Sequence, residues 1–385
     1  MKKKMLITCT VVLVTAAVIL GFVLKNQVRE NPDKNTVNVA IGQWDTTQNE
    51  SQNYWNPDNH AVAKGMGGYY FIQTTDGISK IAFFDETTQE AVAVCAKPEC
   101  THSDNTCNAY LCDMKQTGSA LYLTDTIYCY NGYLYLIQCE GGMGKLVRIH
   151  TDGSARETIA DLFANTGVSS ISLVFHENDV YAYDDTGHAG QEEEAEEVIK
   201  KISLTDGTEQ TVFSYTGTGA SIDRGRSFGD KLYFVIREYT KNKETKAVSS
   251  DYKGLFEYDF ATGDTRKVID ADVCDYHADT ENQMLFYFVQ GTGLYAYDMT
   301  QGSNTLIYPA EDELIQCKMS YDGKKFISFL TMAQAEPQKQ KHAPKDIVMC
   351  WIPKGIRLPK FSVTVSFILA IQTICLKKMQ IIWNI

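Results

Sequence analysis

Asp230-Lys-Leu-Tyr-Phe-Val-Ile236, Gly254-Leu-Phe-Glu-Tyr-Asp-Phe260 and Thr265-Arg-Lys-Val-Ile-Asp270 lie close together in the chain and share one pattern. In each segment apolar or aromatic residues alternate with polar ones, which is the period of an antiparallel β-strand with one buried face. The link Ala261-Thr-Gly-Asp264 between the last two segments has the composition of a tight turn. One such unit is too small to bury its own apolar face, so copies of it must stack against each other.

The same unit recurs along the chain. Each copy contains two aromatic strands, a connection of variable length between them, and a glycine turn that leads to a short further strand. The turn glycines Gly153, Gly207, Gly263 and Gly302 are 54, 56 and 39 residues apart, which is typical of four-stranded propeller blades. We therefore predict an all-β protein in which residues 61–349 form a β-propeller of about six four-stranded blades, the last of them incomplete.

The composition agrees with an all-β protein and limits its partners. The chain has 385 residues, among them 22 Tyr, 17 Phe and 27 Gly, and its net charge is −12. Acidic residues are absent from 1–24 and from 347–385, so the negative charge is concentrated between these ends. Such a surface repels nucleic acids and anionic lipid headgroups, so no nucleic-acid partner is expected.

The N-terminal residues have the pattern of a membrane anchor. Lys2, Lys3 and Lys4 precede an uncharged span from Met5 to Leu24, and about 20 apolar residues are needed to cross a bilayer. We predict that residues 1–25 form a cytoplasmic lysine cluster and a transmembrane signal-anchor helix, and that residues 26–60 form a stalk outside the cytoplasm. The protein would then be a single-pass protein of the cell membrane with its C-terminal domain outside. A cleaved signal peptide is the alternative.

Residues 350–385 differ from the repeats. This tail is basic and apolar, contains no acidic residue, and includes the 16-residue apolar run Phe361 to Leu376. Such a run is short for a membrane span. We weigh two interpretations, a second membrane segment and a change of reading frame that replaced the end of the sixth blade, and favour the second.

Cysteines are concentrated in an insert at residues 95–112, between the first and second copies of the repeat. Four of them lie within 18 residues, namely Cys95, Cys100, Cys107 and Cys112. Because disulfides persist outside the cytoplasm and stabilise loop-rich segments, we predict structural disulfides among these four, with the pairing left open. Cys129 and Cys139 flank a predicted hairpin and form a further candidate pair.

The same insert also permits a metal site. Cys95, Cys100, His102 and Cys107 offer three thiols and an imidazole, a donor set that binds zinc tetrahedrally. We therefore keep zinc as the alternative to disulfides, and we assign no other cofactor.

Insertions occur at one place in the repeat, between the two aromatic strands. In a radial array such loops emerge on one face, which makes this face the first candidate for ligand binding. Its candidate residues are Glu192, Glu193, Glu194, Lys241, Lys243 and Tyr252. We predict a binding or protein-interaction module whose ligand is an extracellular protein, peptide or glycan. The alternatives are a propeller-type enzyme at the cell surface, such as a glycan hydrolase or lyase, and a sensor that responds to zinc or redox state through the cysteine insert.

No catalytic residues are assigned. Gly141-Gly-Met-Gly-Lys145 lacks the flanking glycine and hydroxyl residue of a phosphate loop, and Ser221 lacks the second glycine of a nucleophile elbow. Asp184, Asp259 and Asp298 each follow an aromatic strand, and we predict that they cap turns. An enzyme is thus the less favoured prediction.

Two resemblances agree with the predicted fold. The spacing Cys95-x4-Cys100-x-His102-x4-Cys107-Asn-Ala-Tyr110, followed by tyrosine-rich hairpins, resembles a group of extracytoplasmic β-propeller proteins of Gram-positive gut bacteria whose domains have no assigned function. Ser320-Tyr-Asp-Gly-Lys-Lys-Phe-Ile-Ser-Phe329 is similar to the blade motif of TolB-type propellers, with Tyr321 at the position of the usual proline. Both resemblances imply a fold, and neither implies an activity.

Overall fold

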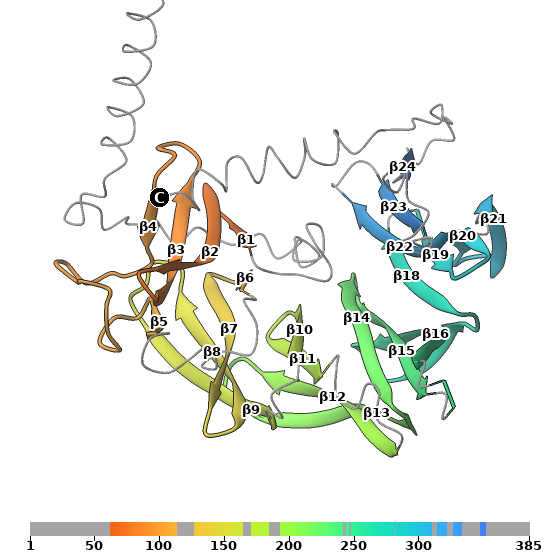
Figure 1. The fold of residues 1–385 in the computed structure, drawn as a ribbon, viewed down its shortest axis with the longest axis horizontal. Helices are drawn as coiled ribbons and strands as arrows, with labels where there is room; N and C mark the ends of the chain where they lie inside the picture. Colours follow the sequence, from red (N-terminus) through yellow and green to blue (C-terminus); the bar gives the residue numbers. More distant parts are fainter. Residues whose placement is uncertain are drawn as a thin grey trace, which may run out of the picture. The chain divides into compact units, whose positions relative to one another are not determined.

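The computed structural model describes residues 62–113, 127–164, 171–184, 193–241, 244–245, 248–280 and 282–309, and the backbone of 314–321, 326–332 and 347–351 (Figure 1). All of them belong to one compact unit, Thr36–Val365. The predicted anchor at residues 1–25, the stalk at 26–60 and the tail beyond residue 351 lie outside the described residues. Within the described part of the chain, no helix has the length and hydropathy of a membrane span.

The strands of the described residues form six antiparallel sheets, and each sheet contains strands that follow one another in the chain (Figure 1). We call them blades one to six. Blade one contains β1 (Val62–Gly65), β2 (Gly68–Thr75), β3 (Ile78–Asp85), β4 (Ala91–Ala93) and a fifth strand, β5 (Tyr110–Asp113), that also pairs with β3. Blade two contains β6 (Tyr128–Tyr130), β7 (Tyr133–Glu140), β8 (Met143–His150) and β9 (Arg156–Ala164). Blade three contains β10 (Ile171–His176), β11 (Asp179–Asp184), β12 (Glu194–Ser203) and β13 (Glu209–Thr218).

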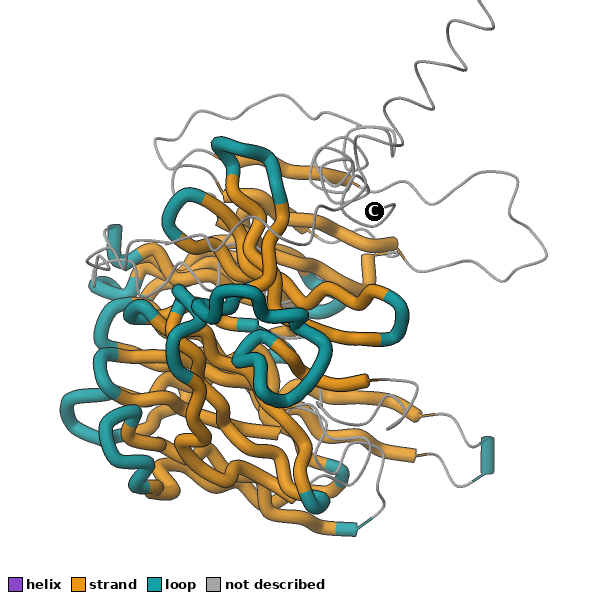
Figure 2. The backbone as a smooth tube through the Cα atoms, turned by 90° about the vertical axis from the view of Figure 1, so that its left-hand side faces the viewer, coloured by secondary structure: helices purple, strands orange, loops and turns teal. Residues whose placement is uncertain are grey.

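The remaining blades continue in the same order. Blade four contains β14 (Ala220–Phe228), β15 (Lys231–Lys241), β16 (Val248–Asp259) and β17 (Thr265–Ile269). Blade five contains β18 (Val273–Asp279), β19 (Met284–Val289), β20 (Gly293–Asp298) and β21 (Ser303–Pro309). Of blade six, β22 (Leu314–Tyr321), β23 (Phe326–Met332) and β24 (Ile347–Trp351) are described. Seen from the side, strands account for most of the described chain and loops connect them (Figure 2).

The aromatic strands of the repeat are the second and third strands of a blade. In blade four they are β15 and β16, in which Leu232 lies opposite Tyr258 and Phe234 opposite Phe256. The turn that follows contains Gly263 with φ +77°, a conformation that glycine adopts without strain. The predicted four-stranded blade is confirmed in blades two to five.

The core is shared between blades. One cluster of buried residues joins blades one and two, a second joins two and three, a third joins three and four, and a fourth joins four and five. Between blades two and three, Phe175 lies 4.8 Å from the ring centroid of Tyr135 and 4.9 Å from that of Tyr130. The Leu173 amide also donates to the Tyr128 hydroxyl at 3.2 Å. The prediction that the copies stack is therefore confirmed, and the chain has the blade arrangement of a β-propeller.

Turn capping follows the prediction at two of three aspartates. Asp259 Oδ1 accepts from the amides of Ala261 and Thr262 at 2.8 and 3.0 Å, and Asp298 Oδ1 accepts from those of Thr300 and Gln301 at 2.9 and 3.0 Å. Asp184 ends β11, the second strand of its blade, whereas the other two end third strands. Asp184 therefore does not share the position of the other two. The residues that follow it lie outside the described part of the chain, so its capping of a turn stays a prediction.

Candidate metal centre

The cysteine insert leaves and returns to one strand of blade one. β4 pairs with β3 through Phe83 and its neighbours, and β5 pairs with the start of the same strand. At the join, the Val94 amide donates to the Ile81 carbonyl at 3.0 Å, and the Ile81 amide donates to the Ala109 carbonyl at 2.9 Å. Both ends of the insert are therefore fixed on β3, so the loop between them begins and ends at neighbouring positions of one strand.

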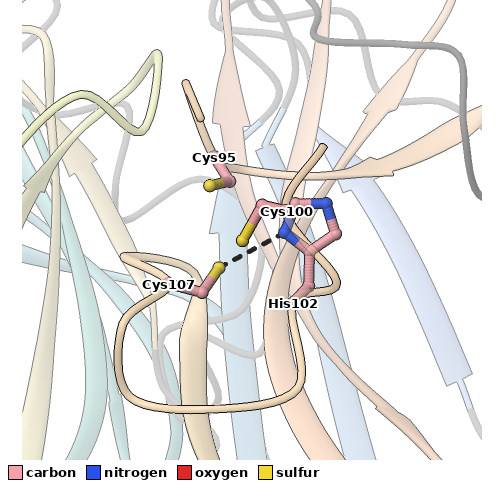
Figure 3. A group of neighbouring side chains, drawn as sticks. All are labelled: Cys95, Cys100, His102 and Cys107. Atoms are coloured by element: carbon pink, nitrogen blue, oxygen red, sulfur yellow. Dashed lines mark hydrogen bonds between the residues drawn. The ribbon is translucent and has the colours of Figure 1, made fainter. Parts of the chain in front are cut away.

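Three thiols and one imidazole converge within this loop (Figure 3). The ligand atoms of Cys95, Cys100, His102 and Cys107 all lie within 4.8 Å of one another. Nδ1 of His102 lies 3.3 Å from the Cys107 sulfur. Cys95 and Cys107 are buried, with 5% and 1% of their surface exposed, while Cys100 and His102 are half-buried. Ligands of a tetrahedral zinc, with bonds of about 2.0 to 2.3 Å, are separated by roughly 3.5 to 3.8 Å, so small side-chain rotations suffice to close this set around an ion.

The backbone of the loop is bent at two unusual positions. Glu99 and His102 have φ of +59° and +55°, in the left-handed region that non-glycine residues seldom adopt. Closer to Cys107, Asp104 accepts from the Thr106 amide at 2.9 Å, and Lys97 donates to the Thr106 carbonyl. Strain of this kind is retained where the surrounding structure requires one conformation. Here it accompanies the bends that bring Cys100 and His102 to the two buried thiols.

The insert is also fixed to blade two. The Asn108 side-chain amide donates to the Gly153 carbonyl at 2.8 Å, and the Arg156 guanidinium donates to the Asn108 carbonyl at 3.2 Å. Gly153 lies in the turn between β8 and β9 and has φ +74°. It packs directly against the start of the insert, since a Cβ at this position would lie 2.5 Å from the Val94 carbonyl oxygen and 2.6 Å from the Cys95 backbone. The cluster thus lies at the junction of blades one and two.

The protonation of the cluster depends on its burial. Burial is the main reason that the pKa of the Cys107 thiol is raised to about 12, and the nearby Cys95 and Cys100 act in the same direction. Burial also lowers the pKa of His102, and the charge of Lys80 lowers it further. The protein alone therefore holds a neutral thiol and a neutral imidazole here at neutral pH, and a bound dication would supply the charge that favours thiolate.

The other predicted cysteines lie elsewhere. Cys112 is buried in β5 opposite Ser79 and is not a member of the converging group. Cys95, Cys100, Cys107 and Cys112 are all free thiols. Cys129 lies opposite Leu134, and Cys139 follows five residues further along β7, which corresponds to roughly 17 Å. Bridged cysteines have Cα atoms less than about 7 Å apart, so these two do not meet across the hairpin.

The predicted loop-face residues fall on blades three and four. Glu193 and Glu194 are exposed at the start of β12, and Tyr252 lies half-buried in β16 opposite Arg237. Lys241 ends β15, whereas Glu192 and Lys243 lie outside the described residues. The Gly219 amide donates to the Glu193 carbonyl at 3.4 Å, and the Tyr239 amide donates to the Gly219 carbonyl at 3.1 Å. These backbone contacts place the blade-three and blade-four residues at the same end of their sheets.

Replacement of Gly153 tests the junction. We expect Gly153→Ala to lower the free energy of unfolding by about 3 kcal/mol, because the new Cβ meets the backbone of the insert as well as forcing a left-handed alanine. Gly263→Ala is the matched control, since its φ is +77° but its Cβ would meet nothing closer than the Tyr258 hydroxyl at 3.8 Å; we expect about 1 kcal/mol there. Urea unfolding of both variants gives the comparison, and equal losses would contradict the described packing.

Comparisons with known proteins reveal likeness only among solved structures. No family description and no curated protein matches the chain. An oligogalacturonate lyase in complex with manganese has a TM-score of 0.46 at 11% identity, covering 75% of this chain and 74% of that one. One of two prolyl endopeptidases has a TM-score of 0.42 at 11% identity, covering 74% and 40%. A putative TolB from Agrobacterium tumefaciens has a TM-score of 0.34 at 11% identity, covering 57% and 73%. At these scores no activity is transferred, and the chain is a β-propeller by the arrangement of its own sheets.

Proposed function

We propose that Cys95, Cys100, His102 and Cys107 bind one zinc ion, which fixes the cysteine insert at the junction of blades one and two. The observation that supports this is the convergence of all four donor atoms within 4.8 Å. Thiolate and imidazole ligands suit zinc, and four protein ligands fill a tetrahedral site completely. A filled site has no open position for water or substrate, so the role of the metal would be structural.

The same geometry argues for metal over the disulfides we first favoured. One bridge within the group would use two of three thiols and leave the third beside the His102 ring, while Cys112 lies outside the group. A zinc ion uses all four donors at once. The positive charge of the ion would also offset the burial that raises the pKa of the Cys107 thiol, so that Cys107 could bind as a thiolate.

For the whole chain, we propose a binding module presented outside the cytoplasm. The lysine cluster and the uncharged span from Met5 to Leu24 support a single membrane anchor at residues 1–25. The long β15–β16 hairpin supports a binding role for this end of blade four, because β17 pairs only with Leu255–Tyr258 and leaves residues 248–254 of β16 beyond it. An extracellular protein, peptide or glycan remains the proposed class of ligand.

Metal analysis of the purified full-length chain tests the centre. We expect one zinc per chain, and we expect a chelator to expose three additional reactive thiols. Cys107→Ser should lose the metal, whereas Cys112→Ser, which removes an equally buried thiol outside the group, should retain it. A metal-free chain in which mass spectrometry maps a disulfide within Cys95–Cys107 would overturn the proposal.

A further inference from the structure

The side of β16 that faces away from β15 is unpaired over part of its length. β16 runs from Val248 to Asp259, but β17 pairs only with Leu255–Tyr258. Just before Leu255, β16 has one extra residue relative to β15, and Gly254 there has φ +120°. Such a bulge bends a strand and interrupts its ladder. Within the described part of the chain, no strand therefore pairs with the outer side of residues 248–252. We call this stretch the free edge of β16.

Two hydrogen bonds show which backbone groups point outward from the free edge. The Tyr239 amide of β15 donates to the Gly219 carbonyl at 3.1 Å, on the side away from β16. Ser250 lies opposite Tyr239, so the two form a non-hydrogen-bonded pair, and the N–H and C=O of Ser250 point away from β15. Tyr252, two residues along, points the same way, because its amide donates to the Asp272 carboxylate at 2.8 Å. The Asp272 oxygen thus takes the place of a carbonyl from a neighbouring strand, and beside it Ser250 lacks such a partner among the described residues.

The side chains next to the free edge are acidic. Asp251 is exposed, and no described cation lies within ion-pair distance of it, since Lys253 pairs with Glu238 at 2.8 Å instead. Asp272 is a second carboxylate at this edge. Burial raises its pKa, and the negative charge of Asp251 raises it further, which shows that the two carboxylates lie close together. A strand that joins this edge would therefore be stabilised by a positively charged side chain.

We propose that an extended, basic segment of another protein adds to the free edge of β16 as a further antiparallel strand. Backbone hydrogen bonds to Ser250 would supply affinity, as in other complexes formed by strand addition. The residue opposite Asp251 would belong to a non-hydrogen-bonded pair, in which side chains lie closest, so a lysine or arginine there would pair with the carboxylate. This inference rests on the proposed role as a binding module and selects a basic peptide segment as its ligand.

A second copy of this chain fits the free edge less well. Antiparallel pairing about Ser250 or Asp251 would bring the two Asp251 side chains to neighbouring or directly opposite positions. Like charges at such positions are destabilising. The net charge of −12 opposes self-association as well. A partner segment of opposite charge avoids both penalties.

Fluorescence anisotropy with the full-length chain tests the proposal. The probe is a fluorescein-labelled, amidated peptide Thr-Val-Lys-Val-Thr, which places a lysine on one face and two valines on the other. One comparison peptide has glutamate in place of the lysine, and a second has methyl groups on both valine nitrogens. We expect saturable binding of the lysine peptide, about fivefold weaker binding of the glutamate peptide, and about tenfold weaker binding of the methylated one, which cannot donate to the edge. Absence of saturable binding by the lysine peptide, or equal binding of all three, overturns the proposal.

Variants of Ser250 locate the site. Ser250→Pro removes the outward N–H but no hydrogen bond to β15, so we expect a folded chain that binds the lysine peptide about tenfold more weakly. Ser250→Ala is the matched control, because it keeps the N–H, and its affinity should stay within twofold of the parent. Equal affinities of the two variants would refute the assignment to the free edge.

The charge of Asp251 gives a second test, which also serves if Ser250→Pro does not fold. We expect Asp251→Asn to weaken binding of the lysine peptide about threefold, the effect of an exposed ion pair. Asp264→Asn, in the exposed turn after β16, removes the same charge away from the free edge and should leave the affinity unchanged. An affinity that is the same in both variants counts against the site.

The remaining outcomes separate this inference from the proposed functions. Peptide binding that Ser250→Pro does not weaken would leave the binding role of the chain standing and refute the free edge as its site. A dimer in sedimentation velocity that Ser250→Pro abolishes would show that a second copy covers the edge, which also overturns the inference. Zinc is measured on the same samples, and a chain that holds zinc but binds no peptide contradicts strand addition and leaves the metal centre standing.

Discussion

Chelation of the zinc proposed at Cys95, Cys100, His102 and Cys107 is expected to lower the unfolding temperature of the full-length chain by about 7 °C. A ligand that binds only the folded state, at a concentration a thousandfold above its Kd, raises the free energy of unfolding by about 4 kcal/mol. Dividing this energy by an unfolding entropy of about 2.1 cal/mol/K per residue, summed over the predicted propeller at residues 61–349, gives the stated shift. The physical reason is that the buried Cys95 and Cys107 would lose the proposed metal as their common ligand, close to where the insert is fixed on β3. Differential scanning calorimetry with and without chelator measures the effect.

Two controls belong with this experiment. Cys112→Ser should show the same shift on chelation as the parent chain, because Cys112 is not among the four converging residues. Cys107→Ser should unfold at the lower temperature from the start and should not respond to chelator. A parent chain whose unfolding temperature is insensitive to chelator would show that no metal stabilises the insert.

Asp275→Asn is expected to cost about 3 to 5 kcal/mol of unfolding free energy. Asp275 is fully buried and accepts from Arg226 at 2.8 Å, with Arg224 at 3.5 Å. Neutralising it removes the ion-pair partner of the buried Arg226 and one of the two described ion-pair partners of the buried Arg224, and removal of one partner of a buried pair has this cost. The amide keeps the shape of the carboxylate, so the loss reports charge and not volume. Urea unfolding followed by tryptophan fluorescence or circular dichroism measures it.

Asp270→Asn provides the exposed counterpart of that variant. Asp270 pairs with Lys267 at 2.9 Å, but its side chain is 86% exposed. Exposed pairs of this kind contribute less than about 0.5 kcal/mol. Similar losses in Asp275→Asn and Asp270→Asn would mean that the ion pairs of Asp275 with Arg224 and Arg226 do not join blade four to blade five.

The repeat could be predicted because its signal is local. Alternation within β15 and β16, and a glycine in the turn that follows, appear directly in the order of the residues. The position of Asp184 was misjudged, because each copy has two aromatic strands and an aspartate after the first of them has the same local pattern as one after the second. Local pattern identifies strands better than it identifies their rank in a sheet.

The candidate sites depend on contacts that are distant in sequence. Spacing alone allowed disulfides or zinc, and it already named His102 as the fourth member of the zinc set. The convergence of the four donor atoms depends on how the insert is fixed to β3 and to Gly153. The buried ion pairs of Arg224 and Arg226 with Asp275 were missed. Their signal was Asp223-Arg-Gly-Arg226, a glycine between two arginines within a strand, which marks a bulge. Their partner Asp275 is 49 residues from Arg226, and no local pattern connects them.

The shared clusters of the core bear on how such a chain can change in length. Each of the four clusters is divided between two neighbouring blades, so the apolar contents of a blade are matched to its neighbours on both sides. Deleting one blade by recombination would bring together two faces that had not been selected to fit one another. Exchange of a segment that runs from the middle of one blade to the middle of the next would instead transfer a complete cluster. Viable chimaeras should therefore have their crossover points within sheets and not between them.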